Sequence, residues 1–200
     1  MASDLFYPSD TRLCFSQIKH WYTTRMSSID IDLRPVDHIS IDALGQPGKR
    51  IFYLQGWQGE RTITLIIEKL QLQTLAVGIE QFLAEVQEKV STLREASADY
   101  EEELMHIHPP LDPLFRVGEF GLGYDSENDL MILVARELMP EGAPAEEGGV
   151  VRFWCTRDQL RALARWGIEV ASRGRPICPQ CGEPMDPEGH FCPKKNGHKR

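Results

Sequence analysis

The chain has 200 residues, of which 42% are hydrophobic and 26% are charged. This composition excludes a wholly disordered chain, a collagen and a disulfide-saturated miniprotein, and the length suits one domain or one domain with an appendage. The net charge of −8 makes the chain as a whole a poor candidate for binding nucleic acid or an anionic membrane through bulk charge.

The N-terminal residues carry no clear structural pattern. Residues 1–25 follow neither a period of 2 nor one of 3.6, so we expect residues 1–35 to be a loose segment. Met26 is a second candidate start, and the residues before it would then be an over-extension of the gene. No apolar run approaches the ~18 residues that span a bilayer, and no secretory signal is visible. Unpaired Cys14 and Cys155 suit a reducing compartment, so we expect a cytoplasmic protein without membrane contact.

Alternating residues predict three strands and then a helix in the first half of the chain. The strands are expected over residues 38–43, 50–55 and 62–68, with turns at 45–48 and 56–59. The pattern then changes, and apolar residues recur three or four positions apart over residues 69–90. That spacing predicts an amphipathic helix lying on the sheet; its apolar positions are Leu72, Leu75, Ile79, Phe82, Val86 and Val90.

The second half of the chain repeats this order after a long loop. Residues 94–113 are acidic and end in several prolines, which predicts a loop. Strands are expected over residues 114–124, 130–138 and 150–155. The middle one should be central in the sheet because residues 130–135 are apolar on both faces. Thr156 and Gln159 have the spacing of a capping box and predict a helix that ends at Gly174.

The predicted order is therefore three strands and a helix, twice. Four identities at an offset of 88 residues are a weak sign of a duplication of this βββα unit: Gln71, Leu72, Leu75 and Ala76 match Gln159, Leu160, Leu163 and Ala164. Four identities between two amphipathic helices can also arise by chance. We expect an α+β domain over residues 36–174, in which two helices cover a mainly antiparallel sheet of about six strands. Residues 175–200 form a separate tail.

The tail carries the strongest chemical signal in the chain. Cys178-Pro-Gln-Cys181 offers two thiolates from one tight turn, and Gly182 can adopt a positive φ without strain. His190 and Cys192 lie two residues apart, so both point the same way on an extended segment. These four side chains supply the ligands of a structural zinc site, and so short a zinc-ribbon-like knuckle would need the metal in order to fold.

Two alternatives to this ligand set stay open. His198 is also an acceptable fourth ligand, since it follows Cys192 at a loop-like spacing. The Cys-x-x-Cys pair could instead be a redox dithiol, although that chemistry requires the pair at a helix N-terminus and the surrounding prolines oppose a helix. Residues 173–200 carry six basic and three acidic residues, net +3, so residues 1–172 carry −11.

Weaker signals lie in the body of the protein. Arg50, Tyr53, Gln55, Glu68 and Lys69 could line a pocket on the sheet, although a hairpin with exposed aromatic residues is the favoured interpretation of this segment. The histidine pair at positions 106 and 108, near Asp112, could hold a metal or act in acid–base chemistry. The glycines of residues 118–123 do not follow the order of a dinucleotide-binding loop and precede a strand rather than a helix.

Several segments together resemble one family, the bacterial domain of unknown function family 3090. They are residues 47–55, 68–71 and 115–125, and the tail runs Cys-Pro-x-Cys-Gly and Gly-His-x-Cys-Pro. The resemblance covers about residues 36–200. It implies that His190 completes the metal site, since members of the family often have tyrosine at the position of His198. It implies no activity.

These observations support three functional hypotheses. The first is a cytoplasmic, non-enzymatic binding or adaptor module with a structural zinc ion and an unidentified protein partner. The second is an enzyme whose site lies on the sheet near Arg50 and Lys69, with the tail as a brace. The third, which is weaker, is contact between the basic tail and RNA phosphates.

Overall fold

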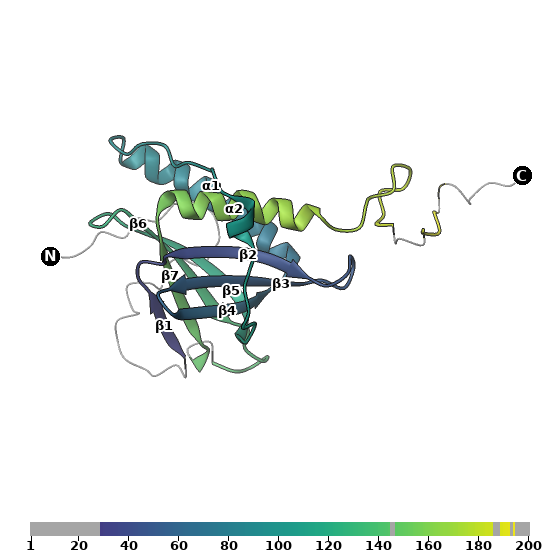
Figure 1. The fold of residues 1–200 in the computed structure, drawn as a ribbon, viewed down its shortest axis with the longest axis horizontal. Coiled ribbons are helices and arrows are strands. Elements are labelled where there is room, and N and C mark those ends of the chain that lie inside the picture. Colours follow the sequence, from purple (N-terminus) through teal and green to yellow (C-terminus); the bar gives the residue numbers. More distant parts are fainter. Residues whose placement is uncertain (1–28, 145–146, 186–188, 193, 195–200) are drawn as a thin grey trace, which may run out of the picture.

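The computed structural model of the chain describes residues 29–144, 147–185, 189–192 and Lys194. Within them lies a seven-stranded sheet in the order β1-β7-β6-β5-β4-β3-β2 (Figure 1). Its strands are β1 (Asp30–Leu33), β2 (His38–Leu44), β3 (Ile51–Gln58), β4 (Arg61–Ile67), β5 (Pro113–Asp125), β6 (Leu130–Glu137) and β7 (Val150–Cys155). Only the β1–β7 and β4–β5 pairs are parallel. The α+β class and the mostly antiparallel sheet are therefore confirmed.

Strand β1 lies inside the segment that the sequence predicts to be loose. It runs parallel to β7 with Leu33 opposite Phe153, and both of these side chains are fully buried. Alternation of Asp30, Ile31 and Asp32 before Leu33 gives the strand one apolar face, which packs into the core. The expectations for residues 1–28, including a start at Met26, fall outside the described residues.

The sheet curls so that its two edges approach each other. The segment that joins β1 to β2 bonds to strands on both sides: Val36 N–H donates to the Trp154 carbonyl at 2.9 Å, and Asp37 N–H donates to the Trp57 carbonyl at 2.8 Å. Gly56 of β3 lies against the ring of Phe153 on β7. Sequence reasoning placed Gly56 in a turn. The structure corrects this, because β3 continues to Gln58 and the turn is confined to residues 59–60.

Two helices pack on the concave, apolar face of the sheet (Figure 1). They are α1 (Lys69–Lys89) and α2 (Arg157–Ser172). Both begin with a capping box, formed by Glu68 with Gln71 and by Thr156 with Gln159. The helices touch closely where Gly167 of α2 meets Leu72 of α1, since a Cβ at Gly167 would come within 2.5 Å of the Leu72 side chain.

The order βββα occurs twice along the chain, as β2-β3-β4-α1 and β5-β6-β7-α2. Gln71 and Gln159, which match at the offset of 88, occupy the same position (N3) in the two helices. The matched leucines and alanines that follow them are all buried. The four identical residues therefore occupy corresponding positions in α1 and α2. That the two units arose by duplication stays a prediction.

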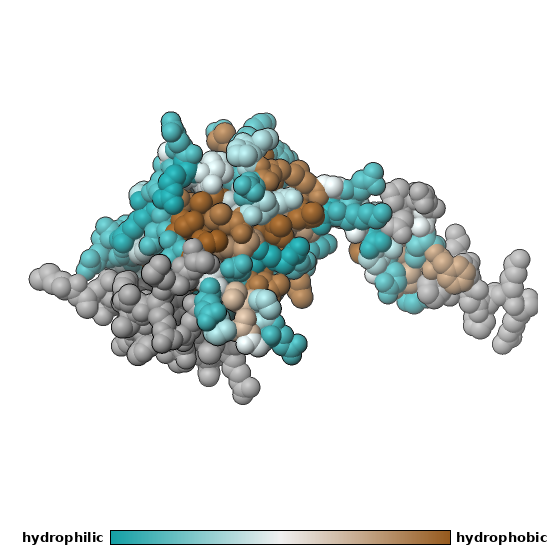
Figure 2. All heavy atoms as spheres, turned by 90° about the horizontal axis from the view of Figure 1, so that it is seen from below, coloured by the Kyte–Doolittle hydropathy of each residue, from teal (hydrophilic) through white to brown (hydrophobic). Residues whose placement is uncertain are grey.

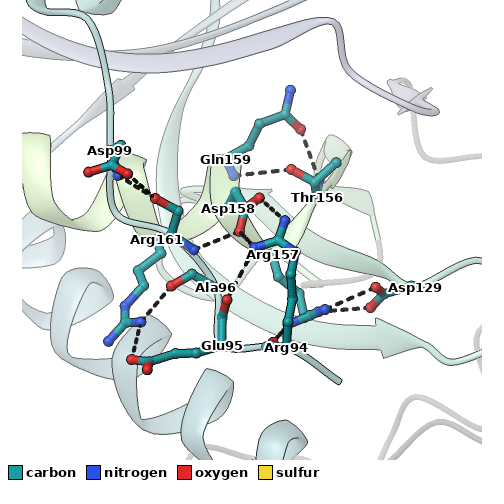
Figure 3. A network of polar contacts seen from close by, with 11 residues as sticks. Arg94, Glu95, Ala96, Asp99, Asp129, Thr156, Arg157, Asp158, Gln159 and Arg161 are labelled. Atoms are coloured by element: carbon teal, nitrogen blue, oxygen red, sulfur yellow. Dashed lines mark hydrogen bonds and ion pairs between the residues drawn. The ribbon is translucent and has the colours of Figure 1, made fainter. Parts of the chain in front are cut away.

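A polar network holds the loop after α1 against the start of α2 (Figure 3). The Arg157 guanidinium, whose side chain is 9% exposed, contacts both carboxylate oxygens of Asp129 and donates to the Arg94 carbonyl. Arg161 donates to the Ala96 carbonyl at 2.7 Å and to a carboxylate oxygen of Glu95 at 2.8 Å. The predicted loop is therefore confirmed as a long connection, but its first residues are fastened to the body.

The far side of the sheet carries the rest of this connection. The short 3-10 helix η2 (Glu102–Met105) and the residues after it lie over β2, where Ser40 Oγ bonds to the Met105 carbonyl and the Met105 side chain is buried. Figure 2 shows the molecule from the side opposite the helices, with hydrophobic residues gathered near its middle. Leu44 and Ile51, which pair across β2 and β3, are exposed.

Candidate metal centre

The chain after α2 forms a small knuckle that projects away from the sheet (Figure 1). A bridge between Ile177 and Pro184 closes it. Inside the bridge, Cys178 N–H donates to the Glu183 carbonyl at 2.8 Å, and Gly182 N–H donates to the Cys178 carbonyl at 2.9 Å. Gly182 has φ 81°, a conformation that glycine adopts without strain. This local geometry turns Cys178 and Cys181 toward the same point.

Four side chains converge in the knuckle. Cys178, Cys181, His190 and Cys192 each offer one ligand atom, and these atoms all lie within 4.8 Å of one another. The Cys178 and Cys192 sulfurs are 3.9 Å apart, and Cys181 Sγ is 3.2 Å from His190 Nε2. The separation of the two sulfurs is far too long for a disulfide, whose S–S bond is about 2 Å.

These distances suit a tetrahedral metal ion. Zinc–sulfur bonds are about 2.3 Å long, so two thiolates on a zinc tetrahedron stand about 3.8 Å apart, close to the 3.9 Å between the Cys178 and Cys192 sulfurs. Cys178 and Cys192 are buried, and Cys181 and His190 are partly exposed. The cluster could therefore hold one metal ion with a Cys₃His set, while His198 lies outside the described residues.

Backbone donors favour a thiolate at the first cysteine. The N–H groups of Cys181 and Gln180 donate to the Cys178 sulfur and lower the pKa of that thiol. At Cys181 the N–H of Glu183 acts in the same direction. Burial and the neighbouring Cys178 and Cys192 sulfurs outweigh it, so that the pKa of Cys181 is raised. Neighbouring thiolates repel one another, which disfavours ionisation of all three thiols. A bound cation offsets this repulsion because it attracts every thiolate at once.

Cys155 belongs to a different environment from the cysteines of the knuckle. Its side chain lies fully buried at the end of β7, and desolvation raises the pKa of its thiol. A thiol with a raised pKa is a poor nucleophile and a poor metal ligand. Cys155 is therefore a core residue.

The five residues predicted as a pocket have different structural surroundings. Gln55 is fully buried, where its side chain bonds to Thr64 Oγ1 at 2.8 Å and to the backbone of His108. Glu68 caps α1 and forms an ion pair with Arg116. Both residues therefore have structural partners.

Of the remaining three predicted pocket residues, two lie together and the third lies elsewhere. Arg50 and Lys69 come together at the C-terminal end of α2, since a Cβ at Gly174 would lie 3.2 Å from an Arg50 nitrogen and 3.5 Å from the Lys69 nitrogen. Tyr53 is half-buried in the middle of β3, opposite Asp42 and Ile66. An enzyme site built from all five residues thus gains no support from the geometry.

Sequence reasoning missed the true partners of the histidines. His106 Nδ1 lies 2.9 Å from a carboxylate oxygen of Asp42 on β2, not beside Asp112. The ring of His38 stacks near Trp57, and burial lowers the pKa of His38. The contacts of His106 with Asp42 and of His108 with Gln55 join residues 64 and 53 positions apart, so no local motif could have indicated them.

The described residues also form a groove of about 530 Å³ between α1, α2 and the loop that joins α1 to β5. Its polar wall includes Arg157 and Arg161, whose guanidinium groups are engaged in the network of Figure 3. None of the helices in the described part of the chain is long and apolar enough to cross a membrane.

Comparison with known proteins places the chain in a family. A family model with the description "Protein of unknown function (DUF3090)" matches residues 31–192, a range that contains all seven strands except the first residue of β1, both helices and the four side chains of the knuckle. No curated protein and no solved structure matches the chain. The resemblance expected from the sequence is confirmed, and the chain belongs to the DUF3090 family of proteins of unknown function.

Proposed function

We propose that this protein is a non-enzymatic binding module of the cytoplasm, in which one structural zinc ion folds the C-terminal knuckle. The observation that carries the proposal is the convergence of three thiols and one imidazole within 4.8 Å. A knuckle of this size buries too little surface to fold alone, so metal binding would supply the folding free energy. Zinc needs reduced thiols, which agrees with a cytoplasmic location.

A structural role for the metal follows from the donor set. Four protein ligands fill the tetrahedron and leave no position for water or substrate. The cation would neutralise part of the repulsion among three thiolates and tie the two halves of the knuckle together. Fixing the knuckle also fixes the direction of its exposed side chains.

Exposed apolar residues on the knuckle support a binding role. Phe191 stands between two of the four converging residues and is 78% exposed, while Ile177 at the base of the turn is 59% exposed. Aromatic side chains held on a rigid, projecting element are typical anchors of binding surfaces. The knuckle therefore presents a partner with a small, zinc-fixed contact surface.

The test compares capture of partners by the full chain and by three variants. Phe191→Ser should retain zinc and lose the captured partner, whereas Val77→Ser, at an exposed apolar position on α1, should retain both. Loss of the partner in Cys178→Ser/Cys181→Ser but not in Phe191→Ser would place the interface elsewhere. Equal capture by all variants would refute a binding role of the knuckle.

A further inference from the structure

The root of the knuckle carries a group of basic side chains contributed by three separate segments. Lys49 lies in the β2–β3 turn, Arg50 follows it, Lys69 opens α1, and Arg175 leads from α2 into the knuckle. A Cβ at Gly48 would lie 3.2 Å from Arg175 Nε, so the turn and the knuckle linker are in contact. Figure 1 shows this hairpin and the start of the knuckle on the same side of the molecule.

Three of these cations, Lys49, Arg50 and Lys69, differ from other cations nearby that are paired with carboxylates. Arg116 pairs with Glu68, and Arg173 pairs with Glu102. By contrast, neither Lys49, Arg50 nor Lys69 forms an ion pair with any carboxylate of the described residues.

The arrangement of Arg50 shows how these charges are kept together. Its guanidinium donates to the Val170 carbonyl at 3.1 Å, near the C-terminal end of α2. The exposed carbonyls at a helix C-terminus carry partial negative charge, which favours a cation there. The helix therefore stabilises Arg50 through a dipole and leaves its positive charge uncancelled, so the group keeps an attraction for a polyanion.

The knuckle that follows Arg175 carries an exposed aromatic side chain. Phe191 is exposed on the knuckle, and Lys194 lies three residues further along, also exposed. A positively charged track followed by an exposed ring is the combination that holds single-stranded nucleic acid. The cations contact phosphates, and an unpaired base stacks on the ring. An acidic protein partner would use the cations but would gain nothing specific from the ring.

We propose that the surface formed by Lys49, Arg50, Lys69, Arg175 and Phe191 binds single-stranded nucleic acid. The inference rests on the proposed function, because zinc must fold the knuckle to hold Phe191 in place. It names the class of partner that this surface binds. Most of the contacting cations then belong to the body of the protein and not to the tail, as the sequence alone suggested. The net charge of −8 repels phosphates at long range, so binding depends on these few contacts and weakens steeply with salt.

The test measures fluorescence anisotropy of labelled oligomers with the full-length, zinc-loaded protein over a series of salt concentrations. The probes are an oligouridylate and an oligothymidylate of about 12 nucleotides, a length within the usual site size of such surfaces. A duplex of the same length and a polyglutamate of the same charge are the comparisons. We expect saturable binding of the single strands, at least tenfold tighter than binding of the duplex or of polyglutamate. The ratio of the affinities for oligouridylate and oligothymidylate shows whether the surface prefers RNA or DNA.

Variants separate the two parts of the surface. Lys49→Ala/Lys69→Ala should weaken binding and reduce the slope of log K against log salt by about 1.4, since each phosphate contact to a single strand contributes about 0.7. Phe191→Ala should weaken binding by roughly tenfold without changing the slope. Arg61→Ala, which removes an exposed cation at the start of β4, opposite Gln58 at the far end of β3, should change neither.

Zinc is measured in the same samples. A failure to bind nucleic acid can therefore be told apart from a failure to bind zinc. Zinc-loaded protein that fails to bind single strands, or that binds polyglutamate equally well, overturns this inference and leaves the zinc-folded binding module in place. An effect of Arg61→Ala as large as that of Lys49→Ala/Lys69→Ala also overturns it. Protein that binds no zinc overturns the proposed function itself.

Discussion

Replacing Gly56 by alanine tests the contact between β3 and β7. We expect this substitution to destabilise the protein. The added Cβ would lie 2.6 Å from two carbons of the Phe153 ring and 3.5 Å from Leu33. Carbon atoms normally approach to about 3.5–4.0 Å, so the ring would have to move by about 1 Å. Phe153 and Leu33 are both fully buried, so a movement of the ring would displace the side chains packed around it.

The size of the effect follows from two opposing contributions. Overpacking in a filled core costs about 1–3 kcal/mol, whereas replacing glycine by alanine restricts the unfolded chain and returns about 0.4–1 kcal/mol. We expect a net loss of about 1–2 kcal/mol in the free energy of unfolding. For a chain of this length that loss lowers the melting temperature by about 2–8 °C, which urea and thermal unfolding both measure.

Gly121→Ala is the matched control in the same sheet. A Cβ there would lie 3.7 Å from the Cβ of Val134, an ordinary contact, and neither Gly56 nor Gly121 has a positive φ. The control should therefore unfold at or slightly above the wild-type temperature. Phe153→Leu should relieve part of the cost of Gly56→Ala in the double variant, as expected for side chains in contact. If Gly56→Ala is as stable as Gly121→Ala, the packing of β3 on β7 described above is wrong.

Three further predictions concern the polar groups that fasten the loops. Gln55→Leu should cost about 1–3 kcal/mol and speed exchange of the His108 amide, because that N–H and its carbonyl both lose the partner that binds them. Arg157→Ala should cost about 2 kcal/mol in urea unfolding, since it frees the Arg94 carbonyl and removes the contacts to Asp129. Burial lowers the pKa of His38 below its ordinary 6.5, so the unfolded chain takes up the proton first. The free energy of unfolding should therefore fall as the pH drops from about 6.5, and His38→Gln should remove this slope in urea titrations.

Each of these predictions has an outcome that contradicts it. Unchanged exchange at His108 in Gln55→Leu would mean that the buried amide does not hold the loop. An effect of Arg157→Ala no larger than that of the surface change Arg61→Ala, about 0.5 kcal/mol or less, would remove the network of Figure 3 as a source of stability. A pH slope of the same size in His38→Gln would assign the titration to another group.

Local sequence patterns predicted those elements whose signals lie within a few residues. The capping box of Thr156 and Gln159, the apolar periodicity of α1 and the apolar run of β6 each act over one turn or one strand, and the structure has all three. The four side chains of the knuckle were likewise indicated by spacing, because a Cys-x-x-Cys turn and a His-x-Cys pair position their ligands locally.

What the sequence left out depends on contacts between distant segments. Strand β1 has only four residues, and its stability comes from pairing with β7, about 120 positions away. In the sequence, Gly56 is typical of a turn. In the structure, position 56 needs glycine because the Phe153 ring lies against it, and only the curled sheet brings that ring near. The Asp42–His106 pair and the basic group at the root of the knuckle arise in the same way.

The most direct test of the zinc-folded knuckle is the metal content of the full-length protein purified under reducing conditions, measured by mass spectrometry of the metal. We expect about one zinc ion per chain, retained through gel filtration and lost in Cys178→Ser/Cys181→Ser, with His190→Ala losing it and His198→Ala retaining it. Protein that carries no zinc after growth and purification with zinc, or a double cysteine variant that carries as much zinc as the wild type, would contradict the account.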